Sequence, residues 1–274
     1  MKTHHLILFI ILVSAGCQPK SELSHEEQMI KKIAAHEKAG YDIIDHHAHL
    51  KGGLTMDQLL EHGDKTGITY GVAVNCGWGF PVQNDSALSA YYHSYKDYPA
   101  YTVMQAEGRE WLEMFNPDTV ALFDYVFTDA LTWFDQEGRR TRLWIDDEVF
   151  IDDVEEFMDY YVDQIVTIIT NEPVDIFVNP TFLPGVIRDR YDELWTEQRM
   201  LKVVNAFVES GLALEINART RIPSPAFIKL AKAHGVKFTL GTNNGNADLG
   251  YLEYGLEMIE ECGLQPSDFW NLKK

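Results

Sequence analysis

The alternation of short apolar runs with longer amphipathic stretches most constrains the fold of this chain. The apolar runs have the length of buried strands and occupy residues 42–45, 69–74, 101–104, 122–127, 174–178, 212–216 and 237–240. Helical spacing of apolar residues marks the stretches 55–63, 84–96, 153–170, 192–209, 224–234 and 247–261. Strands that alternate with helices indicate parallel βα units. The sequence therefore predicts an α/β fold, either a parallel barrel or an open doubly wound sheet.

Local chemistry supports these boundaries. Thr55 and Gln58 form the pattern of a capping box, and Ser224 places a cap residue before Pro225. No glycine-rich dinucleotide fingerprint follows the first strand, which weakens the case for a Rossmann-type sheet. The segment 132–152 is long and irregular, and it is either a lid over a site or a surface loop.

The N-terminus looks like the signal of a bacterial lipoprotein. An apolar run at 6–13 is too short to span a bilayer, and small residues then lead to Cys17. We expect an exported protein, anchored on the periplasmic or surface side of the bacterial membrane through lipid on Cys17; the alternative is an ordinary signal peptide with a chance cysteine. The expected organisation is a signal peptide at 1–16, a tether and leading helix at 17–38, and a single barrel domain at 39–274.

The charge balance restricts the partners. The chain has 23 Lys and Arg residues against 42 Asp and Glu residues, a net charge of −19. This balance argues against binding to nucleic acid or to an anionic membrane surface. The expected partner is therefore a small-molecule substrate. This substrate can be anionic, because the local charge within a site can differ from the net charge of the chain. Contact with a membrane is expected through the lipid anchor only.

Polar residues follow the expected strands, where a parallel barrel places its functional groups. They include Asp45–His49, Asn75, Glu107–Arg109, Asp129, Asn179, Glu215–Asn217 and Thr242–Asn244. The sharpest signal is His47 and His49, because two residues apart on an extended strand both imidazoles project to one side. Neutral imidazole binds zinc, iron or manganese, and Asp45 is placed to orient one ring. The alternative is a polar loop with chance histidines.

These residues resemble the PHP (polymerase and histidinol phosphatase) family of metal-dependent phosphoesterases. The stretch 44–50, Ile-Asp-His-His-Ala-His-Leu, looks like the D-x-H-x-H motif that opens the family's first strand. Glu107 resembles its metal-bridging glutamate on the third strand, 174–180 resembles its strand ending in His-Pro, and 214–242 resembles its closing section. The resemblance implies a distorted seven-stranded parallel (β/α)7 TIM-like barrel.

Several expected ligands of the family are replaced. Asn75 and Cys76 stand for Asp-His, Asn179 stands for the His before Pro, and Asn243 stands for an aspartate. A three-metal site is therefore incomplete. His47, His49 and Glu107 remain, and three ligands can hold one divalent metal, which we expect to be zinc, manganese or iron.

The leading hypothesis is a metal-dependent hydrolase that activates water for attack on a phosphoester or related bond. Asp129 would be a fourth ligand or general base, and Arg109 would hold the substrate anion. Expected substrate-binding residues are Asn75, Asn179, Arg219, Arg221 and Asn243. One alternative is an inactive descendant that binds a polar ligand such as a sugar through its amides. The other is an amidohydrolase-type enzyme on a similar barrel.

Overall fold

The computed structural model describes residues 24–272. The expected signal peptide and Cys17 lie outside the described residues. None of the helices in the described part is both long and apolar enough to cross a membrane.

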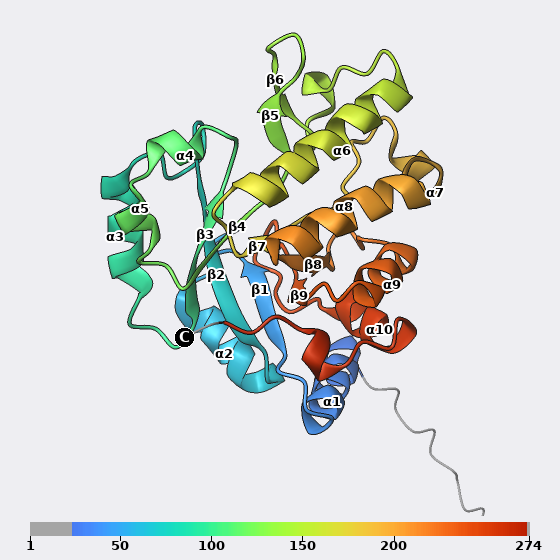
Figure 1. Ribbon diagram of the computed structural model, residues 1–274. Helices are drawn as coiled ribbons and strands as arrows, with labels where there is room; N and C mark the ends of the chain where they lie inside the picture. Colours follow the sequence, from blue (N-terminus) through green and yellow to red (C-terminus); the bar gives the residue numbers. More distant parts are fainter. Residues whose placement is uncertain (1–23, 273–274) are drawn as a thin grey trace, which may run out of the picture.

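Seven parallel strands close into a barrel in the order β1-β2-β3-β4-β7-β8-β9 (Figure 1). Their bounds are β1 (Ile44–Ala48), β2 (Thr69–Cys76), β3 (Tyr101–Ala106), β4 (Tyr125–Thr128), β7 (Ile176–Phe177), β8 (Ala213–Asn217) and β9 (Phe238–Gly241). The first and last strands pair through Asp45 and Leu240, which closes the ring and excludes the open sheet. The predicted seven-stranded α/β barrel is confirmed.

Helices surround the barrel and bury their apolar faces against it (Figure 1). The leading helix α1 (His25–Lys38) forms where the sequence predicts one. The others are α2 (Met56–Thr66), α3 (Asp85–Tyr95), α4 (Trp111–Met114), α5 (Pro117–Val120), α6 (Val154–Asn171), α7 (Tyr191–Leu194), α8 (Glu197–Ser210), α9 (Pro225–Ala233) and α10 (Glu253–Glu261). Short 3-10 turns occur at η1 (Asp146–Glu148), η2 (Arg188–Arg190) and η3 (Pro266–Asp268).

Two expected helices differ from the structure. The stretch 192–209 is broken at Trp195, whose buried indole donates to Thr181 O at 3.0 Å, and α8 restarts behind the N-cap Thr196. The last helix begins at Glu253 rather than near 247, because Gly250 lies in the left-handed region at φ 70°. Tertiary contacts and a local backbone requirement thus override helical spacing.

The irregular segment 132–152 contains an antiparallel hairpin that the sequence did not reveal. Strands β5 (Thr132–Phe134) and β6 (Arg140–Arg142) pair and project beyond the barrel (Figure 1). Arg140 ties this hairpin to the loop after β2, since its guanidinium donates to Trp78 O at 2.6 Å and lies 4.8 Å from the Trp78 ring centroid.

The C-terminal segment covers the opposite, N-terminal end of the barrel. Trp270 donates its backbone N–H to Phe238 O at 2.9 Å. Its ring centroid lies 5.6 Å from that of Tyr125 and 5.7 Å from that of His46. One end of the barrel is therefore packed with aromatic rings, and the other is left for polar groups.

Candidate active site at the C-terminal end of the barrel

A cavity of about 1160 Å³ lies where the strands end. Residues at or after the C-terminal ends of all seven barrel strands contribute to its lining, as the sequence led us to expect. Predicted site residues that line it are Asn75, Glu107, Asp129, Asn179, Arg219, Arg221 and Asn243. His47 and His49 are buried on and just after β1, and Arg109 is not among the lining residues.

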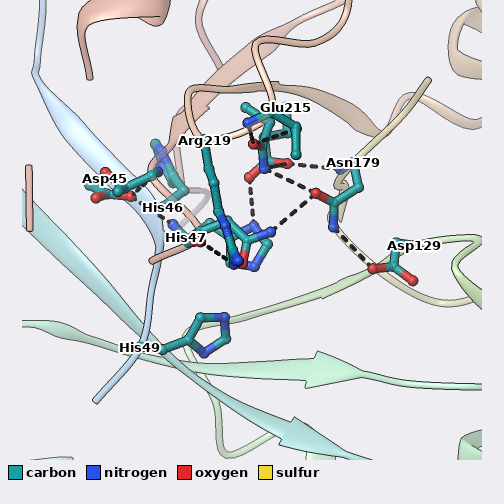
Figure 2. Close-up of polar contacts among 12 residues, drawn as sticks. Asp45, His46, His47, His49, Asp129, Asn179, Glu215 and Arg219 are labelled. Atoms are coloured by element: carbon teal, nitrogen blue, oxygen red, sulfur yellow. Dashed lines mark hydrogen bonds and ion pairs between the residues drawn. The ribbon is translucent and has the colours of Figure 1, made fainter. Parts of the chain in front are cut away.

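Both histidines are held by a hydrogen bond through Nδ1, and their Nε2 atoms have no hydrogen-bond partner in the described part of the chain. His47 Nδ1 lies 2.6 Å from Glu215 Oε1 (Figure 2). His49 Nδ1 donates to Ala73 O at 2.9 Å. Since carboxylate and carbonyl oxygens accept, Nδ1 carries a proton in each ring, and Nε2 is the nitrogen that faces no acceptor or donor. Both Nε2 atoms are buried and have no hydrogen-bond partner within residues 24–272. Burial, with the nearby His47, lowers the pKa of His49 well below its ordinary value, so this ring is neutral.

Glu107 brings a carboxylate to the same end of the barrel. Asn75 Nδ2 donates to Glu107 Oε1 at 2.6 Å, while Oε2 is buried with no partner in the described part of the chain. Burial and the neighbouring Asp129 raise the pKa of Glu107 well above its ordinary value. A buried carboxylate of this kind is stabilised either by a proton or by a cation.

The asparagines form a network around Asp129. Asn179 Nδ2 donates to Asp129 Oδ2 at 3.1 Å, and Leu131 N donates to Asp129 Oδ1 at 2.9 Å. Asn179 Oδ1 accepts from Asn217 Nδ2 at 3.0 Å and from Asn243 Nδ2 at 3.2 Å. Both lone pairs of that oxygen are therefore used within the protein. Burial raises the pKa of Asp129 above its ordinary value.

The residues present fit a divalent metal in their chemistry. Two imidazole nitrogens and one carboxylate oxygen, all buried and unpartnered among the described atoms, are the ligand types that zinc, manganese or iron accepts. Each imidazole is also oriented by a hydrogen bond through its other nitrogen, as metal-binding histidines are. Across residues 24–272, however, no three or more His, Cys, Asp or Glu side chains are gathered closely enough to hold a metal as they stand.

The three arginines predicted for the site differ in their contacts. Arg109 pairs with Glu172, with Nη1 at 2.5 Å from Oε1, and its Nη2 donates to Asp129 O at 2.9 Å, so it supports the end of β4 from outside the cavity. Arg221 pairs with Glu257 at 2.7 Å. Arg219 donates to Asn243 O at 3.3 Å and has no carboxylate partner in the described chain, which leaves its charge available to a ligand.

Sequence reasoning favoured Asp45 over Glu215 as the acceptor for a histidine ring, and it missed two residues of the site. The His47 ring bonds to Glu215 rather than to Asp45. Asp45 Oδ1 instead accepts hydrogen bonds from the backbone N–H groups of His47, at 3.1 Å, and Thr242, at 2.9 Å. Lys51 and Gln105 also line the cavity. Lys51 follows His49 by two residues, and that position at the end of the first strand was the one available signal.

Comparisons with known proteins support the fold. No family model matches the chain, and no curated protein sequence matches it. Among solved structures, it is similar to the histidinol phosphate phosphatase of Lactococcus lactis subsp. lactis Il1403, determined with zinc, L-histidinol and phosphate. The TM-score is 0.58 at 15% sequence identity, over 82% of this chain and 95% of that one. The likeness supports a PHP-like fold.

Proposed function

We propose that this protein is a metal-dependent hydrolase of the PHP type that acts on an anionic phosphoester. The observation that carries the proposal is the pair of imidazoles fixed through Nδ1, whose Nε2 atoms are buried without partners together with Glu107 Oε2. Leaving three such atoms unpaired costs free energy that a bound cation recovers. The zinc-containing phosphatase with a similar fold supports the same reading.

The residues divide into roles. His47, His49 and Glu107 would hold one zinc, manganese or iron ion, which when bound supplies Lewis-acid stabilisation of the developing charge. Asp129 would accept the proton of the attacking water at Oδ2, which keeps a second lone pair beside its bond from Asn179. Arg219 would hold the substrate anion. Arg109 is assigned a positioning role, since it fixes the backbone at Asp129.

Metal content and turnover test the proposal together. Protein purified without chelator, or after reconstitution, is expected to hold about one equivalent of metal by mass spectrometry and to hydrolyse members of a phosphoester panel. His49→Ala is expected to lose the metal and about 100-fold or more of the turnover. His93→Ala is the matched control, because His93 is exposed on α3. No metal in the reconstituted protein, or unchanged turnover in His49→Ala, would contradict the proposal.

The asparagine network favours a second candidate, a metal-free pocket that binds a polar ligand such as a sugar. Asn75, Asn179 and Asn243 keep hydrogen-bonding capacity at the cavity without charge. Such a protein is expected to be stabilised against heat by its ligand in the presence of chelator, whereas the hydrolase is not.

We further propose, from the sequence alone, that the protein is exported and lipid-anchored through Cys17. In a bacterial host, Cys17→Ser is expected to move the protein from the membrane fraction to the soluble fraction. The parent protein is the control, and a Cys17→Ser protein that stays in the membrane fraction would count against lipidation.

A further inference from the structure

The cavity is far larger than the polar site at the strand ends, which forms its floor. At about 1160 Å³ it exceeds what a phosphate group requires, and its volume is that of sites for larger organic ligands. Apolar and aromatic side chains from separate elements form much of the remaining lining: Phe80, Trp144, Phe182, Tyr191, Tyr254 and Met258. The cavity thus has a polar part at the strand ends and an aromatic part around it.

Among the aromatic side chains that line the cavity, Trp144 is the most exposed. It is 43% exposed, and its ring centroid lies 6.5 Å from that of Phe80. Its neighbours hold it in place, since Leu143 is fully buried and Leu143 N donates to Leu131 O at 2.9 Å. A tryptophan kept in water on a fixed backbone is a surface available to a ligand.

The cavity also has cations without partners. Lys51, Arg188 and Arg219 line it, and none has a carboxylate within ion-pair distance in the described chain. Arg188 instead lies over the Phe182 ring, 5.4 Å from its centroid, and donates to Leu183 O at 3.3 Å. Five carboxylates also line the cavity, of which Glu257 and Glu261 are paired with Arg221 and Lys229. The three cations without an ion-pair partner are the groups that can hold an anionic occupant in a chain of net charge −19.

We propose that the ligand is an organic phosphate that carries an apolar aromatic ring. The phosphate lies at Lys51 and Arg219 beside the polar floor, and the ring packs against Trp144 and Phe80. This assignment rests on the proposed function, in which the protein hydrolyses a phosphoester. It adds the chemical class of the organic group that hydrolysis releases. Aromatic rings favour planar partners, and the Arg140 guanidinium, 5.8 Å from the Phe80 ring centroid, favours them as well.

Calorimetric titration with two phosphonates tests this assignment without requiring hydrolysis. Phenylphosphonate and methylphosphonate share the anion and differ in the ring. In the presence of zinc, the protein is expected to bind phenylphosphonate about tenfold more tightly. Trp144→Ala is expected to remove most of this preference and to leave methylphosphonate affinity unchanged. Phe150→Ala is the control, because Phe150 is 52% exposed on the same segment and lines a different hollow.

The outcomes separate this inference from the proposed function. Equal affinity for the two phosphonates, binding of neither, or an unaltered preference in Trp144→Ala would each overturn the aromatic assignment. Turnover of phosphoesters without any ring preference would overturn it and leave the hydrolase intact. A ring preference that depends on Trp144, in a protein without turnover, would support the aromatic site and remove the hydrolase. Circular dichroism of Trp144→Ala checks that the fold is retained.

Discussion

Among single residues, Glu215 contributes most to the order of the candidate site. Its Oε1 lies within hydrogen-bond distance of the His47 ring, and its Oε2 accepts hydrogen bonds from Asn179 N at 2.8 Å and Asn217 Nδ2 at 3.0 Å (Figure 2). Gly241 makes room for this carboxylate, since a Cβ at that position would collide with Glu215 Oε1 and lie 2.8 Å from His47 Cβ. One buried carboxylate therefore links β1, β8 and Asn179, two residues beyond β7.

Glu215→Gln tests this role. A glutamine amide has one acceptor and one donor end, so its NH2 must face either the His47 ring or the donors at Asn179 and Asn217. We expect the free energy of unfolding to fall by about 1–3 kcal/mol, and metal affinity to fall by about 10–100-fold. Denaturant unfolding and titration against a competing chelator measure the two effects.

Glu261→Gln is the matched control, because Glu261 lines the outer cavity in an exposed ion pair with Lys229 at 3.5 Å. It is expected to change stability by less than about 0.5 kcal/mol. A Glu215→Gln protein that behaves like this control would show that the carboxylate does not position His47.

The sequence revealed some of these residues and not others, for a physical reason. The spacing of His47 and His49 is local, and a strand's period of two places both rings on one side. The pairing of His47 with Glu215 joins residues 168 positions apart, and that of Arg109 with Glu172 joins residues 63 apart. Such pairs depend on strand order and register, which no local pattern encodes.

At the level of elements, strands were easier to predict than the segments between them. Most barrel strands are buried on both sides and therefore appear as largely apolar runs, whereas β1 carries Asp45, His46 and His47 after its first residue. Even β7, with only Ile176–Phe177, lies within such a run. The β5–β6 hairpin was missed because it is short, carries Arg140–Arg142 in one strand, and depends on contacts with the loop after β2.

Helix α2 offers a test of a boundary that the sequence did predict. Thr55 Oγ1 accepts Gln58 N at 3.3 Å, and Gln58 Oε1 accepts Thr55 N at 2.9 Å, which completes the capping box. Thr55→Ala is expected to lower the free energy of unfolding by about 1 kcal/mol. Ser94→Ala is the control, because the Ser94 hydroxyl bonds to Ala90 O within α3 and caps nothing. Equal stability of the two variants in urea would show that the cap contributes little.

At the level of the whole molecule, the two ends of the barrel have different tasks. The C-terminal end carries the cavity and its buried polar network, and the N-terminal end is closed by the chain's last described segment. In α/β barrels the functional residues lie at the C-terminal end of the strands, whereas residues at the N-terminal end mainly stabilise the fold. The N-terminal end can therefore be weakened without altering the ligand site.

Trp270→Ala tests that division. Trp270 is partly buried against Tyr125 and His46, so its loss is expected to lower the free energy of unfolding by about 2–3 kcal/mol, less than for a fully buried tryptophan. Phosphonate affinity is expected to stay within about twofold, since distant sites act independently. Trp78→Ala, which removes a tryptophan that is 52% exposed, is expected to cost less than about 1 kcal/mol. If Trp270→Ala weakened phosphonate binding as strongly as Trp144→Ala, the two ends of the barrel would be coupled, and the cavity could not be treated as a site set by the strand ends alone.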